Sequence, residues 1–412
     1  MTAPEELAGR FGTPAYVYDL DRVAAARDDL FAALPEQVEV FYAAKANPHP
    51  ELLRELRAGG TRGCRAEISS VGELDAALRA GFPGDRILYT GPAKTTEEIT
   101  EALTRGVRLF STESPGDLRR VGESALELGL TADCLLRVNN ATGAAATSIR
   151  MTGVPSQFGF DSETLPALAA DLREVPGTTL AGLHFFPLSS AKDEASLIAE
   201  FRHTIACAAA LQESLGVTFR FLDIGGGFAS PYAVQGERPV YGTLRAALTE
   251  ALDAHFPGWR AGAPQVACES GRYLVADSGT LLTSVVNVKD SRDQRYVLLD
   301  AGINTFGGMS GLGRIMPVSV EPHESTGADG VPANLAGPLC TPGDLLGRNV
   351  PLPDPAPDDL LTVPNAGAYG PTASLLMFLG RPAPAEIVVR GDALVSVSRI
   401  EHTRTYDHGQ AL

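Results

Sequence analysis

A single lysine closes the first long apolar segment of the chain. Residues 38–44 read as a strand, Lys45 follows directly, and Asn47 and Pro48 end the segment. Lysine is rarely buried completely, and an amine removed from water becomes a nucleophile towards carbonyl groups because burial disfavours its charged form. The position therefore indicates Schiff-base chemistry. Taken alone, the segment is explained more simply by a lysine that extends from a strand end into solvent.

Three consecutive glycines and a later arginine indicate a phosphate site. Gly225–Gly227 lack side chains, so their backbone N–H groups could converge on phosphate oxygens. A tight turn explains such a run as well. Arg272 would add a planar guanidinium. With Lys45 for an aldehyde and Glu269 for a pyridine nitrogen, these residues match the needs of pyridoxal phosphate.

Eight short apolar runs alternate with helix-like segments in the first two thirds of the chain. The runs are 38–45, 64–69, 86–90, 107–111, 133–138, 180–185, 220–224 and 264–269. Strands that alternate with helices predict parallel β/α units, and eight units predict a closed (β/α)₈ TIM barrel. An open doubly wound sheet is the alternative, but no GxGxxG motif follows the first run. In a barrel of this kind, active-site residues gather at the carboxyl ends of the strands.

The pattern changes after Arg272, where short strands predominate and helix signals become scarce. We expect an α/β protein with the barrel over 25–270 and a β-rich, barrel-like or sandwich-like domain over 1–24 and 271–412. The strand at 15–18 is expected to pair within this second domain. The segment 318–359 is rich in proline, glycine and aspartate and is expected to form loops.

Charge and cysteine content narrow the class of protein. The 412 residues carry a net charge of −16, which disfavours nucleic acids and anionic membranes as partners. No apolar run is long enough to cross a bilayer, and the N-terminus does not read as a signal peptide. The five cysteines are scattered without a CxxC pair, so we expect no metal site and a reducing cytoplasm.

Seven ordered motifs resemble the fold-type III pyridoxal phosphate decarboxylases, the group of ornithine, arginine and diaminopimelate decarboxylases. The resemblance covers nearly the whole chain. The motifs are YAAKAN (42–47), EISSVGEL (67–74), GPAKT (91–95), DIGGGF (223–228), ESGR (269–272), GPLCTPGD (337–344) and NAGAYG (365–370).

The resemblance implies a role for each matching residue. Lys45 would carry pyridoxal 5'-phosphate, and Cys340, reaching across from the partner of a homodimer with shared active sites, would protonate the carbanion left by carbon dioxide. Asp344 and Arg314 would contact the amino acid substrate, although an ion pair at the surface explains Arg314 equally well. The other residues implied in cofactor binding are Glu67, Arg137, His184, Phe186, Ser189, Gly226, Gly227, Glu269, Gly271, Arg272 and Tyr369.

The segment after the sixth run departs from the family pattern, in which a histidine two residues before a Gly-Ser pair stacks on the cofactor ring. Aligned on Ser189, Phe186 takes the stacking position and Leu188 replaces the glycine. His184 either stacks or is a core histidine. Glu67 also replaces the usual aspartate, and Ser270 the usual proline.

The sequence around Cys340 resembles a biosynthetic-cluster branch that includes the butirosin-pathway enzyme acting on glutamate bound to an acyl carrier protein. Diaminopimelate decarboxylases carry Cys-Glu-Ser here, whereas this chain has Cys340-Thr341-Pro342. The resemblance thus implies that the substrate is an amino acid, free or carrier-bound, within a biosynthetic, natural-product pathway. The alternatives are a decarboxylase of a free diamino acid, an amino acid racemase, which Glu269 disfavours, and a pseudo-enzyme that binds partners.

Overall fold

The computed structural model describes residues 3–405 except 60–61, 142–146, 151–152, 154, 308–318, 326 and 328–329, and only the backbone of 147–150. The chain divides into two compact units. The barrel unit comprises Arg22–Ser230 and Glu237–Val275. The sheet unit comprises Met1–Asp21, Pro231–Gly236 and Ala276–Leu412. The short segment 231–236 thus belongs to the sheet unit, whereas the sequence analysis places it in the barrel.

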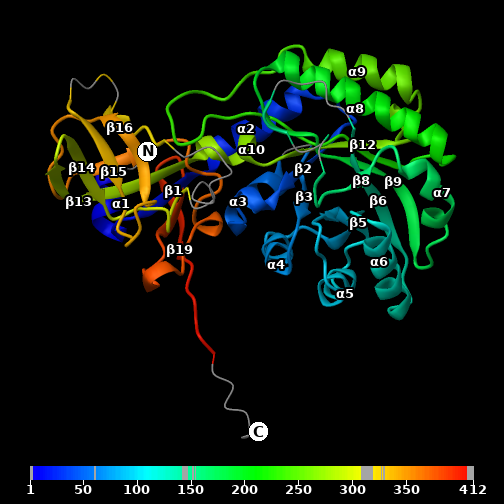
Figure 1. Ribbon diagram of the computed structural model, residues 1–412, viewed down its shortest axis with the longest axis horizontal. Helices are drawn as coiled ribbons and strands as arrows, with labels where there is room; N and C mark the ends of the chain where they lie inside the picture. Colours follow the sequence, from blue (N-terminus) through cyan, green and yellow to red (C-terminus); the bar gives the residue numbers. More distant parts are fainter. Residues whose placement is uncertain are drawn as a thin grey trace, which may run out of the picture. The chain divides into compact units, whose positions relative to one another are not determined.

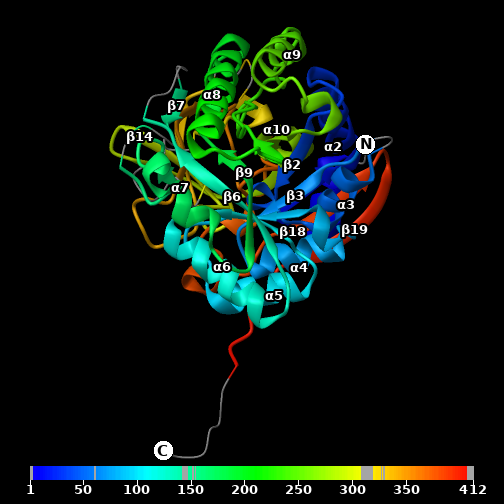
Figure 2. The ribbon, with the colours of Figure 1, turned by 90° about the vertical axis from the view of Figure 1, so that its right-hand side faces the viewer.

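Eight parallel strands close into the barrel, as predicted. Their order around it is β5-β4-β3-β2-β12-β11-β9-β6, and β6 pairs back with β5. The strands are β2 (Glu39–Ala43), β3 (Arg65–Ile68), β4 (Ile87–Tyr89), β5 (Leu109–Thr112), β6 (Ala132–Asn139), β9 (Thr178–Phe185), β11 (Phe221–Asp223) and β12 (Gln265–Ser270). Figure 2 shows the helices arranged around these strands.

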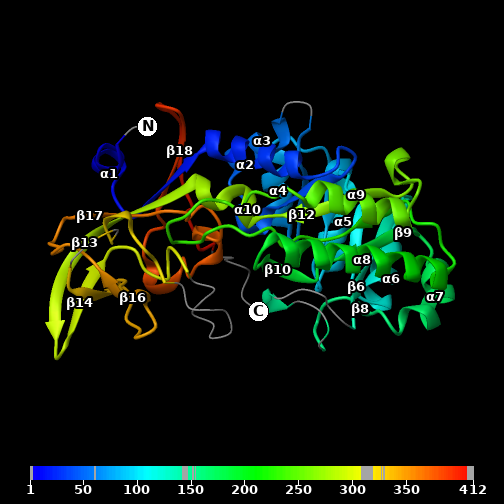
Figure 3. The same cartoon turned by 90° about the horizontal axis from the view of Figure 1, so that it is seen from above.

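Helices follow most of the barrel strands and cover them from outside. They are α2 (Leu20–Ala33), α3 (Pro50–Ala58), α4 (Val71–Arg79), α5 (Thr96–Thr104), α6 (Pro115–Glu127), α7 (Leu165–Arg173), α8 (Glu194–Leu215), α9 (Leu244–His255) and the short α10 (Arg272–Val275). The long helices α8 and α9 lie side by side (Figures 1 and 3). Hydroxyl caps start several helices close to the strand ends: Ser70 accepts from Glu73 N, and Thr95 forms a capping box with Glu98.

Apolar side chains from seven of the eight strands fill the barrel interior. They are Phe41, Leu88, Leu109, Leu135, Ala181, Phe221 and Ala267. Such a layer makes the barrel a packed core and not a pore, so functional side chains are confined to its ends. Three further short strands lie at or near the barrel: β7 (Thr147–Arg150) pairs with β10 (Leu188–Ala191), and β8 (Phe160–Asp161) pairs with β6.

The sheet unit contains one mixed sheet in the order β16-β15-β14-β13-β1-β18-β19, with β17 paired to β13. Its elements are α1 (Pro4–Phe11), β1 (Ala15–Asp19), β13 (Gly279–Ser291), β14 (Gln294–Leu299), β15 (Pro332–Ala336), β16 (Leu345–Pro351), β17 (Leu360–Val363), β18 (Ala385–Arg390) and β19 (Ala393–Arg399). Strand β1 pairs with β13 and β18, which confirms the expected role of the N-terminal strand. Figure 1 shows β13 to β16 next to one another.

The prediction that 318–359 forms only loops is wrong. Strands β15 and β16 lie within it and pair in antiparallel register, with two irregularities. Pro332 and Pro351 sit at strand ends, and Gly347, which lies inside β16, pairs with Leu335 next to the irregularities in the ladder. Among the described residues, no helix is long and apolar enough to cross a membrane.

Candidate active site

The amine of Lys45 stands at the carboxyl end of the barrel, as the sequence predicts, but it is not buried. After β2 the chain turns into a 3₁₀ segment, Ala44–Ala46, whose two alanines are buried while the lysine side chain is 40% exposed. The expectation of a desolvated lysine is therefore wrong. The turn directs Lys45 away from the core, which leaves its tip open to an incoming aldehyde.

Glu67 of β3 holds the lysine. Nζ of Lys45 lies 2.7 Å from Oε2 of Glu67, whose side chain is 2% exposed. The other oxygen of Glu67 accepts from the Thr90 hydroxyl, which follows β4. The carboxylate is thus fixed on both sides, and it places the amine by a charge-assisted hydrogen bond.

Phe186 lies beside the lysine at the end of β9. Its ring centroid is 5.5 Å from Nζ of Lys45 and 6.0 Å from the guanidinium carbon of Arg137. Arg137 of β6 is held in turn by an ion pair of 3.0 Å with Glu113. Two cations near one aromatic ring are electrostatically favourable. Of the two candidates for ring stacking, Phe186 is the one next to the lysine.

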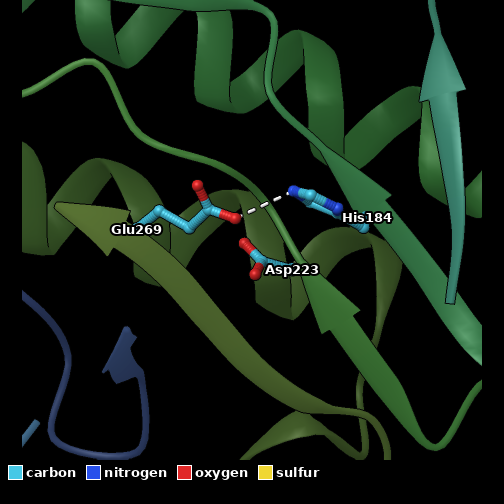
Figure 4. A group of neighbouring side chains, drawn as sticks. All are labelled: His184, Asp223 and Glu269. Carbon is cyan, nitrogen blue, oxygen red and sulfur yellow. Dashed lines mark ion pairs between the residues drawn. The ribbon is translucent and has the colours of Figure 1, made fainter. Parts of the chain in front are cut away.

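His184 points into the barrel instead. It is 1% exposed, its Nδ1 lies 2.6 Å from the Ser111 hydroxyl, and its Nε2 lies 2.9 Å from Oε1 of Glu269. The fully buried Asp223 of β11 completes the group. Figure 4 shows the three side chains approaching one another from β9, β11 and β12. One polar atom from each of His184, Asp223 and Glu269 lies within 4.8 Å of the other two.

Opposing effects set the pKa values of the two acids. Burial would raise the pKa of Glu269, but the charges of His184, Lys45 and Arg137 outweigh it and lower that pKa overall. Burial raises the pKa of Asp223 well above its ordinary value, and the neighbouring Glu269 raises it further. Glu269 is therefore the acid of this pair that ionises first.

The glycine run Gly225–Gly227 lies at the end of β11, where both the local packing and the backbone N–H groups bear on its role. A Cβ on Gly226 would come within 2.5 Å of the Glu269 carbonyl oxygen, and one on Gly227 within 2.3 Å of Leu188. Close packing thus explains why side chains are excluded. In addition, no described residue accepts a hydrogen bond from the buried N–H groups of Gly226 and Gly227. Buried backbone donors are nearly always paired, so these two are suited to an anion.

Arg272 and Gly271 follow β12 near the same strand ends. Nη1 of Arg272 donates to the Ser190 hydroxyl at 3.0 Å, and Ser190 has a positive φ of 55°. A Cβ on Gly271 would approach that of Ala46 to 2.9 Å, so glycine lets β12 lie close to the turn that carries Lys45. Ser189, the serine chosen from the sequence, is half-buried. It lies in β10, pairs with Ile149 of β7, and precedes Ser190, the serine that contacts Arg272.

The residues of the barrel unit fit pyridoxal phosphate. The open amine of Lys45 suits the aldehyde, the two unpaired N–H groups and Arg272 suit the phosphate, and an oxygen of Glu269 suits the ring nitrogen. Among described residues, none donates a hydrogen bond to Oε2 of Glu269, so that atom is available. Once bound, the cofactor would supply an electron sink at the substrate carbon.

Four predicted residues lie outside the barrel unit. In the sheet unit, Cys340 is exposed, Asp344 is 3% exposed, and Tyr369 has a φ of 50° and a ring 6.4 Å from that of Tyr232. Arg314 lies outside the described residues.

Sequence reasoning missed several polar residues that surround the site: Thr90, Ser111, Glu113, Ser190 and Asp223. Most of them occupy the same kind of position, the last residue of a barrel strand or the first after it. That position was the available signal, since strand carboxyl ends form the site in this architecture.

Comparison with known proteins agrees with this geometry. Residues 20–276 match the family "Pyridoxal-dependent decarboxylase, pyridoxal binding domain". An L-glutamyl-[BtrI acyl-carrier protein] decarboxylase of Niallia circulans is 32% identical over 95% of this chain and 92% of the relative. A diaminopimelate decarboxylase of Methanothermobacter thermautotrophicus is 33% identical over 97% of this chain and 91% of the relative.

A solved structure supports the same assignment. Diaminopimelate decarboxylase from Helicobacter pylori complexed with L-lysine superposes with a TM-score of 0.81 at 26% identity, covering 96% of this chain and 95% of that one. The chain therefore belongs to the pyridoxal-dependent decarboxylases and is a pyridoxal phosphate-dependent amino acid decarboxylase.

Proposed function

We propose that the substrate is glutamate joined through its side-chain carboxyl to an acyl carrier protein. Decarboxylation at Cα needs a free α-amine and a free α-carboxyl group, so the side-chain carboxyl is the one left for a tether. A substrate of this kind has an uncharged distal end. A free diamino acid has a distal ammonium group instead, which a binding site recognises with an ionised acid.

The loop that carries Cys340 provides the observation behind this proposal. Asp344 is the one acid in residues 337–344, all of which are described, and both of its oxygens are occupied. Oδ1 accepts from Ile303 N and Oδ2 from Leu339 N, each at 2.7 Å. We therefore propose that Asp344 positions this loop and does not bind substrate.

No other acid replaces it in the loop. Thr341, Pro342 and Gly343, which separate Cys340 from Asp344, are uncharged. A distal ammonium group would find no ionised partner here. The similarity to the Niallia circulans enzyme, which acts on a glutamyl carrier protein, supports the same substrate class.

The remaining parts of the proposal follow the resemblance. The protein would act as a homodimer in the cytoplasm, within a natural-product pathway, and Cys340 would reach the site from the partner subunit. Phe186 would face the cofactor ring, and Tyr369 would contact the phosphate. Because the chain is strongly acidic, as carrier proteins are, docking would depend on a local patch and not on net charge.

The test compares carbon dioxide release from carrier-bound glutamate, free glutamate, ornithine, lysine and diaminopimelate. We expect kcat/KM for the carrier-bound substrate to exceed that of each free amino acid by roughly 100-fold or more. Preference for diaminopimelate would assign the protein to the diamino acid alternative. Chiral analysis of recovered substrate tests the racemase, and absence of carbon dioxide from every substrate would indicate a pseudo-enzyme.

A further inference from the structure

The buried polar side chains around Glu269 include Ser111 as well as His184. Ser111 Oγ lies 2.6 Å from Nδ1 of His184, whose Nε2 lies 2.9 Å from Oε1 of Glu269. The three residues come from β5, β9 and β12, and Ser111 and His184 are each at most 1% exposed. Ser111, His184 and Glu269 thus form a buried polar chain that ends on the acid suited to the ring nitrogen, and Figure 4 shows its contact between His184 and Glu269.

Ser111 is itself firmly anchored. Its carbonyl oxygen accepts from Nζ of Lys94 at 2.8 Å, and Lys94 also pairs with Asp117 at 2.7 Å and donates to Gly91 O. Lys94 is 3% exposed. Because the backbone of β5 is fixed here, the hydroxyl of Ser111 is held against the imidazole ring.

We propose that Ser111 and His184 are positioning residues for Glu269: the Ser111 hydroxyl holds the imidazole ring at Nδ1, and Nε2, 2.9 Å from Oε1, holds that side of the carboxylate. Oε2 then remains for the ring nitrogen. The inference rests on the proposed cofactor site and adds to it the residues that orient the acid.

Ionisable side chains from four other elements face the group. They are Asp223 from β11, Glu67 from β3, Lys45 from the turn after β2 and Arg137 from β6. Oδ1 of Asp223 accepts from Gly225 N at 2.9 Å, while Oδ2 has no partner among described residues. Because burial and the neighbouring Glu269 raise the pKa of Asp223 while the pKa of Glu269 is lowered, the negative charge of the pair lies on Glu269, the acid that would face the ring nitrogen.

The first experiment observes the imidazole ring directly. Protein labelled with ¹⁵N-histidine is studied by NMR with and without pyridoxal phosphate, and His184→Gln identifies the His184 signals. In Ser111→Ala we expect the ring-nitrogen signals of His184 to shift in both forms, because Nδ1 loses its partner. Unchanged His184 signals in Ser111→Ala would overturn the inference.

The second experiment measures cofactor affinity. Ser111→Ala should bind pyridoxal phosphate about five-fold more weakly, in line with the loss of one buried hydrogen bond. The matched control is Ser124→Ala in α6, which removes a buried hydroxyl that has no partner among described residues and lies outside the group. It should leave the cofactor affinity and the His184 signals unchanged. Equal affinity in Ser111→Ala would contradict the role.

A bound cation is the competing explanation for three ligand atoms within 4.8 Å. Zinc or magnesium ions alone should leave the His184 signals and the melting temperature of the cofactor-free protein unchanged. A rise in melting temperature that His184→Gln removes would assign a cation site and overturn the inference. None of these readouts depends on which amino acid is decarboxylated, so a wrong substrate assignment would leave them unaffected.

Discussion

Lys45 and Glu67 form an ion pair of 2.7 Å that links the turn after β2 to the neighbouring strand β3, with the acid buried and the lysine side chain 40% exposed. The pair keeps the amine in place while leaving its tip accessible.

Replacing Lys45 by alanine should abolish covalent attachment of the cofactor. We expect loss of the visible absorbance band and carbon dioxide release at background level, because no other amine occupies this position. Borohydride reduction followed by mass spectrometry should label Lys45 in the unmodified protein. The control is Lys192→Ala, which changes an exposed lysine of the barrel unit. A fully active Lys45→Ala protein would refute the assignment.

Replacing Asp344 by asparagine should loosen the loop that carries Cys340. An amide has one acceptor oxygen, so either Ile303 N or Leu339 N would lose its partner. We expect a loss of about 1–3 kcal/mol in the free energy of unfolding, measured with urea. If Asp344 bound substrate directly, KM would instead rise sharply with stability unchanged.

Replacing Cys340 by alanine should lower kcat by about 100-fold, the usual scale for a general acid, and should increase the fraction of aldehyde side product. The aldehyde would report that the proton had not been placed on Cα, the atom that Cys340 is proposed to protonate. Cys207→Ala is the control, since that thiol is half-buried in α8. Clean amine formation by Cys340→Ala, at an unchanged rate, would count against the role.

Replacing Glu386 by glutamine should change the pH dependence of stability. Glu386 of β18 is 6% exposed, and burial raises its pKa to about 7, opposed by a hydrogen bond of 3.1 Å from Tyr18. Because the folded state binds this proton more tightly than the unfolded state, stability should fall by up to about 3 kcal/mol as pH rises from 4.5 to 7.

The Glu386→Gln variant should lack this pH-dependent contribution to the free energy of unfolding, so its urea midpoint should vary less over the same pH range. Exposed Glu401 offers a control, Glu401→Gln, which should follow the unmodified protein. Identical pH profiles for Glu386→Gln and the unmodified protein would show that Glu386 is ionised when folded.

Local signals in the sequence were enough to predict the barrel. The eight apolar runs alternate with amphipathic segments because each parallel strand is covered on both faces and each helix on one. The same signals located Lys45, Glu67 and Glu269 at strand ends. By contrast, the strands within 318–359 escaped prediction, since their pairing partners are distant in sequence and the prolines and glycines between them read as loops.

The sequence by itself determined which residues are available at the strand ends and therefore which cofactor chemistry the chain can perform. Only the tertiary structure decided that Lys45 is open and not desolvated, that His184 turns inward to Ser111 and Glu269 while Phe186 lies beside the lysine, and that the oxygens of Asp344 are already occupied. The physical reason is that side-chain direction at a strand end depends on the turn that follows and on neighbours from other strands. Neither is encoded within a single segment.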